Sequence, residues 1–154
     1  MSHTLQIPIH FLEQIRRQAE RDYPNETCGI LVGPKAEKDK ISEIYPCENV
    51  QDKYHALDPV SFPRPARTAY FIEPRTLLQI ERENRQKNNE IRVIYHSHVD
   101  ADAYFSEEDH RIALSEGKPA YPGVAYWVVS VLQGKVDGEA LFLWDEARKS
   151  FIQN

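Results

Sequence analysis

The chain has few cysteines, no long apolar run and no excess of positive charge. Its two cysteines, Cys28 and Cys47, are too few for a disulfide framework. The longest nearly apolar stretch, residues 125–132, is far shorter than the ~18 residues that span a bilayer. The first residues contain neither a basic region nor a long apolar region, so no secretion signal is expected. These absences favour a cytoplasmic protein with free thiols and no membrane partner.

The charge and the length of the chain further restrict its class of partner and its number of domains. Lys and Arg together number 19 against 24 Asp and Glu, a net charge of −5. This balance, without a basic stripe, argues against nucleic acid as the main partner. At 154 residues, 41% of them hydrophobic, the chain has the length and composition of one globular domain over residues 1–154. The sequence leaves open whether that domain forms a homodimer.

The first half of the chain alternates helix and strand patterns around one irregular segment. Apolar residues three and four apart predict an amphipathic helix over residues 9–21. Residues 28–33 and 40–45 have strand patterns. Residues 47–69 show no period and contain three closely spaced prolines, which predicts an inserted loop.

The same alternation continues to the end of the chain. A strand is expected at 70–72, a helix from 73 to about 87 with Pro74 in its first turn, and a strand at 91–95. A third helix begins near Ser106, and strands follow at 125–132, 140–144 and, more weakly, around Phe151. This pattern predicts an α/β fold, a three-layer sandwich in which a central mixed sheet is flanked by helices.

Two histidines stand at the end of the 91–95 strand. His96 and His98 are separated by one residue, which on a strand points both imidazoles to the same face. Such a pair can converge on one metal ion. An isolated pair can equally serve as hydrogen-bonding groups at the end of a strand, so its meaning depends on the residues that follow.

Ser106 and Asp109 follow the histidines at a distance that allows the chain to reverse direction. A Ser with an acid three residues later is typical of a helix N-terminus, which explains both residues structurally. The same geometry lets Asp109 face the histidines as a third ligand. Two His and one carboxylate suit Zn²⁺ and leave a fourth position open for water, which favours catalysis.

Hydrolysis at such a site needs a base to accept a proton from water. Composition and spacing alone do not identify which residue is this base. Four acids lie near the motif and one lies far upstream, just before the 28–33 strand: Asp100, Asp102, Glu107, Glu108 and Glu26. Each can also be an ordinary solvated surface residue.

Taken together, these residues resemble the JAMM (MPN-plus) zinc metallopeptidases. That family's signature is an early Glu followed downstream by H-x-H, seven residues, S, two residues and D. This chain has Glu26, then His96 and His98, then Ser106 and Asp109 at those spacings. The order of elements also resembles the family over nearly the whole chain and implies a fold similar to that of cytidine deaminases. Many members have Pro where this chain has Val99, which bears on loop rigidity.

The resemblance implies a role for each matched residue. His96, His98 and Asp109 would hold one Zn²⁺ per chain, Glu26 would be the general acid/base, and Ser106 would stabilise the oxyanion.

The resemblance also implies a class of substrate. Family members cut after the C-terminal Gly-Gly of ubiquitin-like proteins, and short bacterial-type members resemble processing peptidases for small sulfur-carrier proteins. Arg64, Arg67 and Tyr70 in and beside the inserted loop would bind the substrate tail, although that loop can equally be a solvated surface segment.

Three other interpretations compete. Cys28 could be the nucleophile of a cysteine hydrolase, although a Cys at the start of an apolar strand is more often a core residue. A cytidine deaminase needs His-x-Glu and Pro-Cys-x-x-Cys, and Pro46-Cys47 has no second Cys at that spacing. A non-catalytic scaffold of the same fold would typically lack part of the metal set, which this chain retains.

Overall fold

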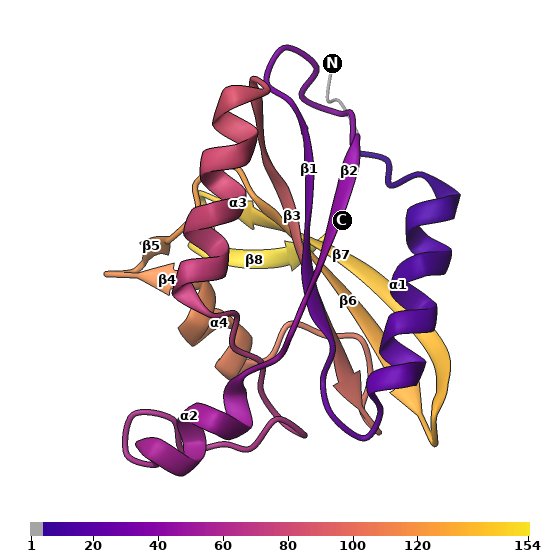
Figure 1. Ribbon diagram of the computed structural model, residues 1–154, viewed down its shortest axis with the longest axis vertical. Coiled ribbons are helices and arrows are strands. Elements are labelled where there is room, and N and C mark those ends of the chain that lie inside the picture. Colours follow the sequence, from indigo (N-terminus) through magenta and orange to yellow (C-terminus); the bar gives the residue numbers. More distant parts are fainter. Residues whose placement is uncertain (1–4) are drawn as a thin grey trace.

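A computed structural model of the chain describes residues 5–154 and shows one central sheet with helices on both sides (Figure 1). The six-stranded sheet has the order β2-β1-β3-β6-β7-β8, and β4 and β5 form a separate small hairpin. The strands are β1 Cys28–Pro34, β2 Glu43–Cys47, β3 Asn89–Val99, β4 Leu114–Ser115, β5 Lys118–Pro119, β6 Ala125–Leu132, β7 Lys135–Asp145 and β8 Ser150–Gln153. The helices are α1 Ile9–Asp22, α2 Gln51–Leu57, α3 Pro74–Gln86 and α4 Glu107–Ala113.

The sheet is mixed, because β3 and β6 run parallel while its other neighbouring strands are antiparallel. Helix α1 lies on one face, and α3 and α4 lie on the other (Figure 1). This arrangement confirms the predicted α/β three-layer sandwich. No helix within residues 5–154 has both the length and the apolar character that crossing a membrane requires.

The face covered by α1 is an apolar layer that includes one satisfied polar network. Phe11, Ile15 and Ala19 lie one helical turn apart and are buried against the sheet. The Tyr95 hydroxyl donates to Gln18 Oε1 at 2.6 Å, and Gln18 Nε2 donates to the Cys28 carbonyl at 2.8 Å. Tyr95 also leaves no room for a side chain at its register partner, Gly29. A Cβ at position 29 would lie 2.1 Å from the Tyr95 hydroxyl oxygen.

The opposite face contains the larger core and, at one end of it, the candidate site. Helix α3 starts with Pro74 at its first position and buries Ile80. Helix α4 starts with the predicted N-terminal motif, in which Ser106 and Asp109 bond each other's backbone. Phe105, just before α4, packs against Phe151 of β8. These contacts attach the start of α4 to the sheet, which fixes where Asp109 points.

The structure corrects the predictions for residues 40–72. The strand expected at 40–45 is β2, which starts at Glu43 and continues to Cys47. The segment 47–69 is not wholly loop, because α2 lies inside it. Residues 70–72 are not a strand, since the backbone of Phe71 bonds Val50 and the Asn49 side chain instead of a sheet neighbour. Proline spacing and local pattern cannot show that pairing, because its partners lie about 20 residues apart.

Candidate functional site

The site begins with the alternation of β3. Ile94, His96 and His98 point to the face covered by α3 and α4, while Val93 and Tyr95 point to α1. His96 is fully buried and His98 is 5% exposed. Their Nε2 atoms lie 3.3 Å apart. The prediction that both imidazoles share one face agrees with this geometry.

Asp109 completes the cluster from the first turn of α4. Its Oδ1 lies 3.1 Å from His96 Nε2, and its Oδ2 lies 3.0 Å from His98 Nε2. The Asp109 N–H donates to Ser106 Oγ at 3.0 Å, and the Ser106 N–H donates to Asp109 Oδ2 at the same distance. The same pair of residues thus begins the helix and orients the carboxylate, so the structural and functional explanations of Ser106 and Asp109 hold together.

The donor atoms fit a divalent cation such as Zn²⁺. His98 Nδ1 lies 2.8 Å from the Asp102 carbonyl, which assigns the ring proton to Nδ1 and leaves a lone pair on Nε2. One donor atom from each of His96, His98 and Asp109 lies within 4.8 Å of the others. Two imidazole nitrogens and one carboxylate are an open-site zinc ligand set.

In the metal-free cluster, the two histidines and Asp109 stabilise each other's charged forms. Burial alone would raise the pKa of Asp109, but the two histidines hold that pKa well below its usual range. Burial lowers the pKa of His98, and its bonds to Asp109 and to the Asp102 carbonyl more than offset this, so the pKa is raised. The carboxylate is therefore ionised, as a metal ligand must be.

Glu26 lies directly before β1 and next to the cluster. Cys28 pairs with His96, and continuing this antiparallel register by two residues brings Glu26 opposite His98. Glu26 is 5% exposed, and its Oε1 has no hydrogen-bond partner. Burial raises the pKa of Glu26 well above its ordinary value, and the charge of Asp109 adds to the effect. A buried carboxyl with a raised pKa and a free oxygen is poised to exchange protons.

Two residues that the sequence did not single out hold Glu26 in place. The Thr27 N–H donates to Ser97 Oγ at 2.7 Å, which explains the polar residue between the two histidines. Asn49 Nδ2 donates to the Glu26 carbonyl at 2.9 Å and also to the Ala69 carbonyl. The position of Ser97 between the two histidines was a usable signal, but no sequence pattern marks Asn49.

Tyr70 is buried against His96, so it is not the surface residue that direct binding of the substrate tail would require. Its ring stacks on His96, with centroids 4.5 Å apart and planes 20° apart. Only 4% of Tyr70 is exposed. The side chain therefore forms the wall behind His96 and restricts the orientation of that imidazole.

The two arginines of the inserted segment make ion pairs around the site. Arg64 Nε lies 3.4 Å from Glu108 on α4, and Arg67 lies 3.2 Å from Asp100 just after β3. Both arginines are about half exposed, and Arg64 opposes the rise in the pKa of Glu26. These pairs attach the inserted segment to α4 and to the turn that follows β3.

The surroundings of Cys28 speak against a cysteine nucleophile. Cys28 is fully buried in the core, and its thiol approaches the Cys47 carbonyl at 3.7 Å. Burial raises the pKa of the Cys28 thiol well above its ordinary value. A protonated and inaccessible thiol is a poor nucleophile.

Together, the fold and the site define a member of the JAB class. The family described as prokaryotic homologs of the JAB domain matches residues 8–145, and the chain belongs to that family. The resemblance found in the sequence is thereby confirmed.

Two curated proteins are similar to this chain in sequence. Proteins named "CysO-cysteine peptidase" from Mycobacterium bovis and Mycobacterium tuberculosis are 30% identical over 95 residues, which is 62% of this chain. The chain spans only 56% of the length of these relatives.

Two solved structures share the fold. The solution structure of a Desulfitobacterium hafniense protein matches with a TM-score of 0.66 and 22% identity, covering 93% of this chain and 84% of the other. That of a Salinibacter ruber protein matches with a TM-score of 0.63 and 21% identity, covering 98% and 88%. At these identities the likeness concerns the fold alone.

Proposed function

We propose that the protein is a zinc-dependent peptidase of the JAMM type that cuts after the C-terminal Gly-Gly of a small ubiquitin-like sulfur-carrier protein. The observation that carries the proposal is the convergence of His96, His98 and Asp109 beside the buried carboxyl of Glu26. Membership of the JAB family and the likeness to relatives named for a CysO-cysteine peptidase support it. The free thiols of Cys28 and Cys47 support a location in the reducing cytoplasm.

In this proposal His96, His98 and Asp109 hold the zinc ion. Zinc supplies Lewis-acid polarisation of the scissile carbonyl and lowers the pKa of water. Glu26 accepts a proton from the attacking water and returns it to the leaving amine, a transfer favoured by its raised pKa. The Ser106 hydroxyl, whose oxygen already accepts the Asp109 N–H, donates its own hydrogen to the developing oxyanion.

The inserted segment would position the extended tail of the carrier. Arg64 and Arg67 flank the site and are exposed enough to contact a bound chain. Tyr70 acts on the tail only indirectly, through the imidazole of His96 that it stacks against.

Mass spectrometry of an extended carrier tests reaction and substrate together. A ubiquitin-like sulfur carrier with residues added beyond its Gly-Gly is incubated with wild-type protein, chelated protein, Glu26→Gln and the exposed control Glu107→Gln. We expect wild type and the control to release a product that ends at the second Gly, and the other two samples to leave the carrier intact. An uncut carrier with zinc-loaded wild-type protein would reject the substrate.

Elemental analysis tests the ligand set separately. Wild-type protein and Glu26→Gln should contain about one zinc per chain. His96→Ala and Asp109→Ala should contain almost none, because each removes one of three protein ligands. If both alanine variants still contain one zinc per chain, these residues are not the zinc ligands. The description of the fold does not depend on this result.

A further inference from the structure

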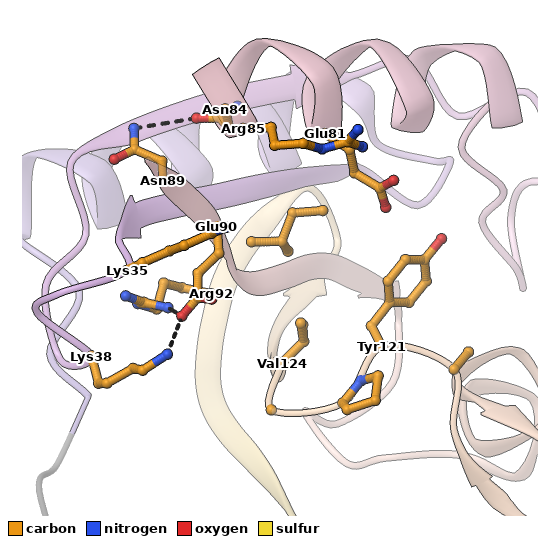
Figure 2. Close-up of a pocket in the computed structure, with 14 residues that line it drawn as sticks. Lys35, Lys38, Glu81, Asn84, Arg85, Asn89, Glu90, Arg92, Tyr121 and Val124 are labelled. Atoms are coloured by element: carbon orange, nitrogen blue, oxygen red, sulfur yellow. Dashed lines mark hydrogen bonds and ion pairs between the residues drawn. The ribbon is translucent and has the colours of Figure 1, made fainter. Parts of the chain in front are cut away.

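A cavity lies at the opposite end of β3 from the histidines. It has a volume of about 610 Å³, within the usual range for small-molecule sites. Its walls are the C-terminal part of α3, the start of β3, the segment 120–124 and the turn after β1 (Figure 2). Arg92 is the lining residue of β3 that is nearest to His96 in sequence, and the four steps between them span roughly 13 Å of strand. The cavity is therefore separate from the proposed active site.

The cavity is positively charged in a chain that is negative overall. Four basic and two acidic side chains line it, which gives an excess of two positive charges against the net charge of −5 for the chain. The lining charges are Lys35, Lys38, Arg85, Arg92, Glu81 and Glu90. A concave surface with this local excess attracts anions.

The two acids do not neutralise these bases. Glu90 is shared, since both Lys38, at 2.8 Å, and Arg92 pair with it. Lys35 and Arg85 have no ion-pair partner within residues 5–154. Two cationic side chains at the mouth of the cavity are thus available to a ligand.

Arg92 adds a buried donor to the cavity wall. It is only 6% exposed, and its guanidinium bonds Glu90, the Pro34 carbonyl and, at 3.1 Å, the Glu37 carbonyl. Its Nε is buried and has no hydrogen-bond partner. An unpartnered donor on a buried charged group is costly, and an anion in the cavity would reduce that cost.

The uncharged part of the lining contains two asparagines, several apolar residues and one aromatic ring. In Figure 2, Tyr121 lies across the cavity from Lys38 and Arg92, with Val124 between them. Ile91 and Pro122 also line the cavity. Burial raises the pKa of the Tyr121 hydroxyl, and Glu81 adds to the effect, so this hydroxyl remains a hydrogen-bond donor. The cavity thus offers cations at one side and a flat apolar surface at the other.

We propose that this cavity binds a phosphate monoester of a flat organic body, a ligand of mononucleotide size. A phosphate monoester carries about −1.5 to −2 charges at neutral pH, which matches the excess of two positive charges. Lys35 and Arg85, the two cations without an ion-pair partner, contact the phosphate, and the flat body lies over Ile91 and against Tyr121.

NMR titration of isotope-labelled protein tests this site with three probes: adenosine 5′-monophosphate, adenosine and inorganic phosphate. We expect the nucleotide to give saturable shifts at the amides that line the cavity. Adenosine and phosphate each provide half of the contacts and should bind about tenfold more weakly or worse. Arg92 is left intact because its removal would disturb a buried network.

Charge-removing variants locate the site. Lys35→Gln and Arg85→Gln should each weaken nucleotide binding about tenfold, the usual effect of losing one charge-assisted contact. Arg75→Gln, on the exposed start of α3 and outside the cavity, should change binding by no more than about twofold.

Three results would overturn the proposal. They are an absence of shifts with the nucleotide at millimolar concentration, equal weakening by all three variants, and inorganic phosphate binding as tightly as the nucleotide. Peptidase activity is not part of the readout, so the cavity and the proposed active site stand or fall separately.

Discussion

The two faces of β3 differ in the kind of buried polar group that they hold. On the α1 face, the Tyr95 hydroxyl and the Gln18 amide bond each other, and Gln18 continues to the Cys28 carbonyl. On the α3 face, His96 Nδ1 and Glu26 Oε1 are buried without partners. The α1 face pairs these two groups with each other, although Trp127 Nε1 on the same face is buried without a partner. The α3 face instead leaves the titratable carboxyl of Glu26 unpaired beside the histidine and aspartate cluster.

This difference assigns stability to one face and chemistry to the other. Buried unpaired polar groups cost stability and persist where function requires them. If the assignment is correct, substitutions on the two faces should separate: one set changes folding with little effect on catalysis, and the other changes catalysis or metal binding with little effect on folding.

The largest expected effect on the α3 face comes from Glu26→Gln. Removal of a general base should lower kcat by about 10²–10⁴-fold while zinc content stays the same, because Glu26 is not a ligand. Steady-state kinetics on the extended carrier, with zinc measured on the same samples, checks this. Glu107→Gln, an exposed acid on α4, is the matched control and should keep the wild-type kcat. A Glu26→Gln enzyme with more than about a tenth of wild-type kcat would remove the proton-transfer role.

The corresponding substitution on the α1 face is Ile15→Ala. Ile15 is fully buried, so its truncation should lower the free energy of unfolding by about 2–5 kcal/mol. Urea denaturation measures that loss, and kcat per folded molecule should be unchanged. Ile9→Ala in the same helix removes a side chain that is 63% exposed and should cost less than about 0.5 kcal/mol. A large fall in kcat for folded Ile15→Ala would show that the two faces are coupled.

Tyr70→Leu sharpens the comparison inside the α3 face. Loss of the ring stacked on His96 should weaken zinc binding by about 10–100-fold, since the imidazole is no longer held in orientation. Competition with a chelating dye measures the affinity. Tyr104→Leu is the graded control, because Tyr104 meets His98 edge-on at 5.0 Å and is 53% exposed. Equal losses from both variants would mean that the stacked geometry has no special role.

The sequence predicted more about the strands and helices than about the inserted segment. Alternation along β3 and the helix N-terminal motif of α4 are local rules, and they predicted that Asp109 could face His96 and His98. The full ligand set was predicted only from the resemblance to the JAMM family. The buried stack of Tyr70 on His96 and the bonds of Asn49 to Glu26 depend on contacts between segments far apart in sequence. Local patterns carry no information about such contacts.

The smallest predicted effect is a pH dependence of stability caused by Glu26. Its folded-state pKa is raised above the unfolded value of about 4.3, so between the two values the folded chain binds more protons than the unfolded chain. The stability associated with Glu26 is therefore present below the unfolded pKa and is lost as the pH rises through the folded one. In metal-free protein, Glu26→Gln should remove this loss, so the stability of the variant relative to wild type should increase as the pH rises above the unfolded pKa. Urea unfolding of both proteins with a chelator at several pH values measures the difference. If the two pH profiles are parallel, Glu26 ionises as easily in the folded protein as in the unfolded chain. Its burial without a hydrogen-bond partner would then cost no stability.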